Sequence, residues 1–184
     1  MTSKISALTS VTAAAEADQH EVNQSGTSKK ATNTQIHALR GLQARYHNSA
    51  TITVASGATS ILNFNTSDYD PASAVTTGAT WHYTVPVTGW YDIRVCQALI
   101  NPDGNVWAAG DGCSIQIYKN GSFLAYLGYE ESDGTTSNDH WLFPVGTFAA
   151  SLTAADTIDL RLNNFSAVGR KLAGSTAIEI YRVA

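Results

Sequence analysis

The amino-acid sequence predicts an all-β protein, folded as a sandwich or jelly roll of antiparallel sheets behind a short N-terminal segment. After residue 50, apolar residues alternate with polar ones in run after run, which is the period of a strand with one buried face. Turn signals separate these runs at regular intervals, as in sandwiches and jelly rolls. Only 14% of the 184 residues are charged, against about 25% in an average soluble domain. This composition favours a β-rich protein with a smooth surface over a helical bundle.

A change in composition near residue 48 divides the chain into two parts. Residues 1–48 contain no Trp or Phe, whereas all four Trp, all five Phe and all four Pro follow. A segment with so few large apolar side chains does not bury enough surface to fold alone. We therefore expect residues 1–48 to form an adaptor that becomes ordered against a partner, and residues 49–184 to form the folded domain.

The adaptor is predicted to contain a hairpin and a short helix. Residues 20–24 read as a strand, the segment 25–28 is a turn signal with a glycine, and residues 29–32 return as a second strand. Thr32 and Gln35 fit a capping box, which predicts a helix that runs to about Tyr46.

Apolar residues in this predicted helix follow the spacing of a coiled-coil seam. Ile36, Leu39, Gln43 and Tyr46 are separated by alternating intervals of three and four residues, with Gln43 interrupting the stripe. Two interpretations stay open: a helix that packs its apolar edge on its own domain, and a short stalk that joins several copies.

The strands of the second part follow in order along the chain. Their signature is a run of apolar side chains, most of them alternating with polar ones and each run ending near a turn signal. We expect strands at 52–54, 61–64, 81–87, 91–95, 113–117, 123–127, 148–152, 158–162 and 178–180. Pro86 marks an edge or an end of its strand, because proline cannot donate to a sheet ladder. Asn120-Gly121 predicts a tight hairpin, since a type I′ turn needs positive φ at both central residues.

Within this pattern, several segments resemble a C1q/TNF-like domain. Phe64 followed by Asn65, and then Pro86, Gly89 and Tyr91, match the first half of that family in order and spacing. Three later segments resemble its central hairpin, its strand entered through an acidic turn and its closing strand: 117–121, 151–160 and 175–180. One departure is Leu172-Ala-Gly-Ser-Thr176, which replaces the usual Phe-Ser-Gly pattern before the closing strand. The resemblance implies a jelly roll and a homotrimer.

The N-terminal part has a resemblance of its own. The segments 4–9 and 21–32 are similar to the leading segments of bacteriophage structural proteins, among them tail-fibre proteins and other surface proteins of the virion. The resemblance implies that this part attaches the protein to the particle and that the jelly roll points outward. The residues expected to make adaptor or oligomer contacts are Ile5, Leu8, Val22, Ile36, Leu39 and Tyr46.

Charge and motifs argue against several other functions. The formal net charge of −4 disfavours nucleic-acid binding, which needs clustered Lys and Arg. We expect no membrane insertion and no secretory signal peptide, because no apolar run of the required length occurs. The sequence contains no nucleophile elbow, phosphate loop or zinc-binding motif. We therefore expect no enzyme, no cofactor and no metal, and a protein made in the host cytoplasm and located in the virion.

Two acidic loops are the candidate ligand-binding sites. The first holds Asp103 and Asp111 on either side of Trp107, and the second holds Trp141. An exposed Trp beside acids and amides stacks on a sugar ring while its neighbours hydrogen-bond the hydroxyls, so a host-surface glycan is a candidate partner. A Trp in such a loop also serves to cap a core or an interface.

These observations predict a bacteriophage virion structural protein that forms a trimeric surface projection. It would be a short tail fibre or knob, attached to other virion proteins through residues 1–48. One alternative is a capsid decoration or cement protein, or a head fibre, that stabilises the phage head. A further alternative is a carbohydrate-binding module of the C1q type.

Overall fold

The computed structural model describes residues 19–24, 27–32, 41–96, 99–100, 107–134, 144–172, 174 and 176–183. The chain divides into two compact units, residues 1–41 and 42–184. No helix long and apolar enough to cross a membrane occurs among the described residues.

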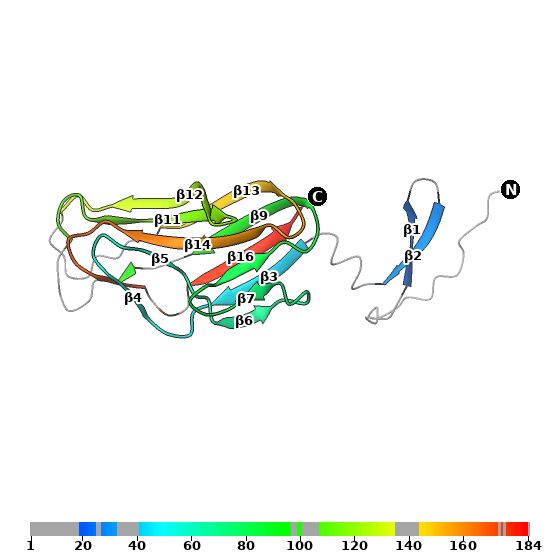
Figure 1. Ribbon diagram of the computed structural model, residues 1–184, viewed down its shortest axis with the longest axis horizontal. Coiled ribbons are helices and arrows are strands. Elements are labelled where there is room, and N and C mark those ends of the chain that lie inside the picture. The colour runs from blue at the N-terminus through cyan, green and yellow to red at the C-terminus, as the bar shows by residue number, and fades with distance from the viewer. Residues whose placement is uncertain are drawn as a thin grey trace, which may run out of the picture. The chain divides into compact units, whose positions relative to one another are not determined.

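The first unit contains a two-stranded antiparallel hairpin (Figure 1). Strand β1 (Gln19–Gln24) pairs with β2 (Thr27–Thr32), with Gln19 opposite Thr32 and Gln24 opposite Thr27. This is the hairpin that the turn signal at 25–28 predicts. Val22 lies in β1, whereas the other expected adaptor contacts of this unit lie outside the described residues: Ile5, Leu8, Ile36 and Leu39.

The helix expected between Thr32 and Tyr46 is wrong over its second half, where the chain forms strand β3 (Gly41–His47). Ala44 and Tyr46 are 1% and 7% exposed, so alternate residues of this segment enter the core. Pairing with neighbouring strands and burial of this alternating face outweigh the local helix signal. The remainder of the expected helix, residues 33–40, lies outside the described residues.

The second unit is a sandwich of two main antiparallel sheets, with a small third sheet at its side (Figure 1). One sheet, called here the β11 sheet, has the order β12-β11-β14-β8-β7, with β5 also paired to β14; the other, the β9 sheet, has the order β13-β9-β16-β3-β6. The small sheet has the order β10-β15-β4. The strands are β4 (Ile52–Val54), β5 (Thr59–Ile61), β6 (Thr66–Tyr69), β7 (Val75–Thr76), β8 (His82–Thr84), β9 (Gly89–Cys96), β10 (Leu99–Ile100), β11 (Gly112–Lys119), β12 (Ser122–Glu131), β13 (Gly146–Leu152), β14 (Thr157–Asn164), β15 (Arg170–Leu172) and β16 (Ala177–Arg182).

The core lies between the β11 and β9 sheets and is built from the apolar halves of the alternating runs. Ile93 of β9 and Ile115 of β11 are fully buried, as the period-two pattern predicts. Trp81 is also fully buried, with ring centroids 5.1 Å from Phe64 and 6.5 Å from Tyr46. Full burial of one such side chain contributes about 1.5–3 kcal/mol. Tyr46 therefore joins β3 to the core and makes residues 41–47 part of the jelly roll.

The turn between β11 and β12 has the predicted geometry. Asn120 and Gly121 have φ angles of 51° and 76°, so both central residues lie in the left-handed region. The turn sets β12 against β11 in a register that contains two irregularities, and this register decides which side chains of β12 point away from the core.

Candidate interaction face on the β9 sheet

The first loop predicted to bind a ligand places its tryptophan in the core. Trp107 is 1% exposed, and the guanidinium of Arg170 lies 3.7 Å from the centre of its ring. Its indole is therefore covered and offers no platform for a sugar, which corrects the expectation of an exposed Trp. Asp103 and Trp141 lie outside the described residues.

Asp111, the other candidate in this loop, is occupied by contacts within the chain. Its carboxylate accepts hydrogen bonds from the backbone N–H groups of Ala108 and Ala167, both at 3.0 Å, and from Arg170 Nη2 at 2.8 Å. Burial lowers the pKa of Arg170, and the Asp111 carboxylate offsets part of that shift. Asp111 therefore acts as a structural anchor, and its role in ligand binding stays a prediction. Among the described residues, no group of three or more His, Cys, Asp or Glu side chains is arranged to hold a metal ion.

The β9 sheet has a second face that points away from the core. Arg94 of β9 lies opposite Thr147 of β13 and Glu179 of β16, and the next outward residue, Asp92, lies opposite Ala149 and Tyr181. Residues paired directly across strands share one face of the sheet. Trp90 continues the row and is 52% exposed. The outward residues of this face, called here the β9 face, are Arg45, Trp90, Asp92, Arg94, Thr147, Ala149, Ser151, Ala177, Glu179 and Tyr181.

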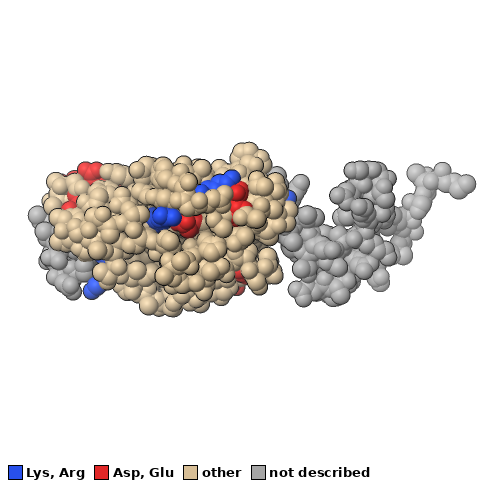
Figure 2. Space-filling model, viewed as in Figure 1, with Lys and Arg blue, Asp and Glu red and all other residues tan. Residues whose placement is uncertain are grey.

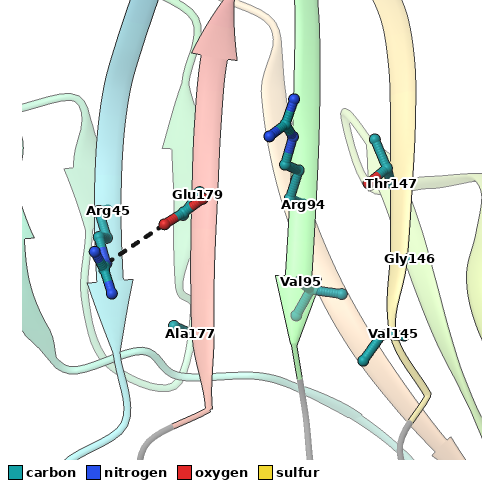
Figure 3. Close-up of a pocket in the computed structure, with 8 residues that line it drawn as sticks. All are labelled: Arg45, Arg94, Val95, Val145, Gly146, Thr147, Ala177 and Glu179. Atoms are coloured by element: carbon teal, nitrogen blue, oxygen red, sulfur yellow. Dashed lines mark ion pairs between the residues drawn. The ribbon is translucent and has the colours of Figure 1, made fainter.

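The charged side chains of the β9 face are paired with one another. Arg94 Nη2 lies 2.6 Å from Asp92 Oδ2, and its guanidinium carbon lies 4.7 Å from the centre of the Tyr181 ring. Arg45 Nε lies 3.6 Å from Glu179 Oε1 (Figure 3). Hydrogen bonding to the Asp92 carboxylate raises the pKa of Arg94, and burial raises the pKa of Tyr181, whose hydroxyl donates to Glu179. Covering a charge that is already paired costs less desolvation free energy than covering an isolated charge.

A shallow pocket of about 380 Å³ lies on this face where four strands adjoin (Figure 3). Arg45 and Glu179 stand on one side of the pocket, and Ala177 and Gly146 add walls with little side-chain volume. Val145, which is 54% exposed, borders it at the edge strand. The pocket combines an exposed apolar rim with neutralised charges, which suits a protein surface better than a small charged ligand.

The face shown in Figure 2 is largely uncharged, and the basic side chains near its middle lie next to acidic ones. This agrees with the low fraction of charged residues in the sequence. The β9 face was not identified as a candidate site from the sequence. The signal was present in segment 91–95, where the polar residues Asp92 and Arg94 alternate with core residues.

Comparisons with known proteins identify the fold. No protein-family model matches the sequence, and no curated protein matches it. The structure is similar to that of Eiger TNF from S. frugiperda, with a TM-score of 0.57 and 19% sequence identity over 79% of this chain and 94% of that chain. It is also similar to murine APRIL, with a TM-score of 0.52 and 9% identity over 78% of this chain and 99% of that chain.

The fold is a TNF-like jelly roll. The C1q/TNF-like resemblance drawn from the sequence is therefore confirmed at the level of the fold. The resemblance of the N-terminal segment to phage proteins, and the trimer, stay predictions. Among the described residues of the jelly roll, the β9 face and the outward side of the β11 sheet are broad sheet faces that point away from the core.

Proposed function

We propose that this chain is a structural protein of a bacteriophage virion, in which three copies associate through the β9 face. The N-terminal segment attaches the trimer to the particle, and the TNF-like jelly rolls form an outward projection such as a short tail fibre or knob. The observation that supports the assembly most directly is the β9 face, where apolar side chains are exposed while the charges are already paired.

The chemistry of the β9 face suits contact with further copies of the chain. Trp90 is 52% exposed, and Val145, which borders the pocket on this face, is 54% exposed. Large aromatic and apolar side chains dominate the energetics of protein interfaces. Ala149 and Ala177 are small, so a neighbouring surface can approach the sheet closely. A closed trimer forms when this face contacts a different patch on the next copy around a three-fold axis.

The attachment role rests on the N-terminal segment. Its similarity to the leading segments of phage structural proteins supports it. Among the described residues the β1–β2 hairpin is a two-stranded sheet, and the outer edges of such a sheet can pair with another chain. The same argument accommodates a decoration or cement protein on the capsid, which differs from the fibre in where the segment attaches.

The test is to locate the protein in purified virions by antibody labelling and to compare the full chain with a truncation. The truncation must remove residues 1–40 rather than 1–48, because β3 begins at Gly41 and its Tyr46 packs in the core. We expect the truncated protein to stay folded and trimeric in sedimentation equilibrium and to be lost from the particles.

The outcomes separate the possibilities. Label on the tail supports the fibre, and label on the capsid supports decoration. Absence of the protein from purified virions would overturn the virion role, and a monomeric full chain would overturn the assembly.

A further inference from the structure

A row of exposed aromatic rings runs along β12 on the outward face of the β11 sheet. Phe123, Tyr126 and Tyr129 are 49%, 60% and 58% exposed. They lie opposite Tyr118, Gln116 and Ser114 of β11, which alternate with the core residues Ile115 and Ile117. Gln116 and Ser114 are 7% and 1% exposed, so this side of β11 is itself covered. We call this row, together with Tyr118 and Phe165, the aromatic strip. The three β12 rings lie opposite β11 residues that are two positions apart, so the strip spans four residues of β11 and is roughly 14 Å long.

Contacts between the rings hold the strip in place. The ring centroid of Phe123 lies 5.8 Å from that of Tyr118 and 5.1 Å from that of Tyr126, both in edge-to-face geometry. The ring of Tyr129 stacks on that of Phe165, with centroids 5.3 Å apart. The Tyr118 hydroxyl donates to Gln116 Oε1 at 3.1 Å. Rings that are already ordered lose little conformational entropy when a ligand binds.

The charges beside the strip are neutralised or unfavourable to anions. Arg161 lies 3.7 Å from the centre of the Tyr118 ring, but its Nε is already paired with Asp159 at 2.6 Å. The Tyr129 hydroxyl donates to Glu131, whose carboxylate places negative charge at one end of the strip. A neutral ligand therefore fits the strip better than an acidic one.

The area of the strip separates a small ligand from a protein partner. Each of the three β12 rings exposes about half of a side chain of roughly 200 Å², so together they offer roughly 300–350 Å². A stable protein interface needs about 800 Å² on each partner. The strip alone is too small for a second copy of the chain and has the dimensions of a narrow, extended molecule.

We propose that the aromatic strip binds a neutral oligosaccharide chain. The C–H face of each sugar ring packs on the electron-rich face of an aromatic ring. The hydroxyls of the sugar hydrogen-bond to the hydroxyl of Tyr126, whose side chain is 60% exposed. Three ring positions in line suit a chain of linked sugars rather than a single one. This site differs from the loops predicted at Trp107 and Trp141, and it does not depend on the β9 face.

The experiment screens the labelled full chain on an array of neutral and acidic bacterial oligosaccharides and then titrates a bound neutral one by calorimetry. We expect neutral chains to bind, and Tyr126→Ala and Tyr129→Ala each to weaken the affinity by about tenfold or more. Tyr69→Ala is the matched control, because Tyr69 is an exposed tyrosine on β6 of the other sheet and is 40% exposed. Its affinity should equal that of the parent.

Four results would overturn the proposal. The first three are that no neutral oligosaccharide binds, that only acidic ones bind, or that Tyr126→Ala binds as well as the parent. The fourth is a loss of self-association in Tyr126→Ala, which would make the strip a contact between copies. Dissociation caused by changes in the β9 face leaves the proposal intact. The two proposals can therefore fail separately.

Discussion

At the scale of single residues, the Asp111 carboxylate joins three separate parts of the chain. It accepts hydrogen bonds from the backbone at Ala108 and Ala167 and pairs with Arg170, whose side chain is fully buried. Arg170 in turn covers the ring of Trp107. A single side chain therefore holds the loop before β11, the loop after β14 and strand β15 in one arrangement.

Replacement of Asp111 by alanine leaves two backbone donors and a buried cation without this acceptor. We expect Asp111→Ala to lower the free energy of unfolding by about 3–5 kcal/mol, the usual cost of breaking a buried ion pair from one side. Urea unfolding followed by tryptophan fluorescence measures the change. Asp68→Ala is the control, because its contacts with Arg45 and His47 lie at the surface and such a pair contributes at most about 1 kcal/mol. Equal losses in the two variants would contradict the anchoring role of Asp111.

This cluster also shows why the sequence does not reveal the burial of Trp107. Trp107 stands among Asp, Asn and Gly residues, which is typical of an exposed loop. The guanidinium of Arg170 covers its ring, and Arg170 is held by Asp111, 59 positions away in the chain. A local pattern does not contain that contact. Of the aromatic strip, only Phe123 and Tyr126 fall within a predicted strand, 123–127. The register of β12 decides which of its residues face outward, and the local pattern does not contain that register.

At the scale of elements, β12 and β13 approach each other closely at two glycines. A Cβ atom on Gly146 would overlap the backbone carbonyl of Leu127, and one on Gly128 would lie 3.0 Å from the backbone of Pro144. The absence of side chains at these positions lets the edge strands of the two sheets come together. It also opens the wall of the pocket on the β9 face, which Gly146 lines.

We expect Gly146→Ala to destabilise the domain by about 1–3 kcal/mol or more, because the backbone of Leu127 has to move to admit a methyl group. The midpoint of thermal unfolding measures this change. Gly169→Ala is the matched control, because its new Cβ would meet its nearest atom, the Val54 carbonyl oxygen, at 3.4 Å, an ordinary contact distance. An unfolding temperature of Gly146→Ala equal to that of the parent would contradict the close approach of β12 and β13 at this glycine.

Most of the elements that could be predicted from sequence have long alternation, although the short strand β4 (Ile52–Val54) is also predicted with its observed bounds. Strands β9, β11 and β14 each have eight residues and repeat the pattern several times. Strands β7 and β15 have two and three residues, too few for a period, and they exist because partners lie beside them. In β3 the alternation of Ala44 and Tyr46 is obscured by Gln43, which is only 6% exposed although it is polar. A helix spacing could therefore be read across the same residues.

At the scale of the whole molecule, the low charge of the sequence acquires a structural meaning. Acidic and basic side chains pair on both sheet faces: Arg94 with Asp92 on one side and Arg161 with Asp159 on the other. The surface is therefore left with large uncharged areas that another molecule can cover. The two faces differ in that the β9 face is framed by small side chains, whereas the outward face of the β11 sheet carries the aromatic strip. This difference is the reason for assigning self-association to the first face and an oligosaccharide to the second.

The assembly predicts a specific dependence on concentration and on Ala149. The full chain should sediment at three times its monomer mass, and its melting temperature should rise with protein concentration, because association stabilises the folded state by mass action. Ala149→Glu places a carboxylate opposite Asp92, whose charge is already paired with Arg94. Covering this additional charge should cost about 2–5 kcal/mol of association free energy, so we expect the variant to sediment as a monomer at micromolar concentration.

Ser122→Glu is the control for added negative charge, because Ser122 is an exposed residue of β12 on the opposite sheet. It should leave the sedimentation unchanged. The melting temperature of Ala149→Glu should no longer depend on concentration, and it should approach the value that the parent shows at high dilution, since Ala149 is exposed and makes no core contact. A variant that still sediments like the parent would show that the copies meet through another surface. A parent whose melting temperature is the same at every concentration would show that they do not associate.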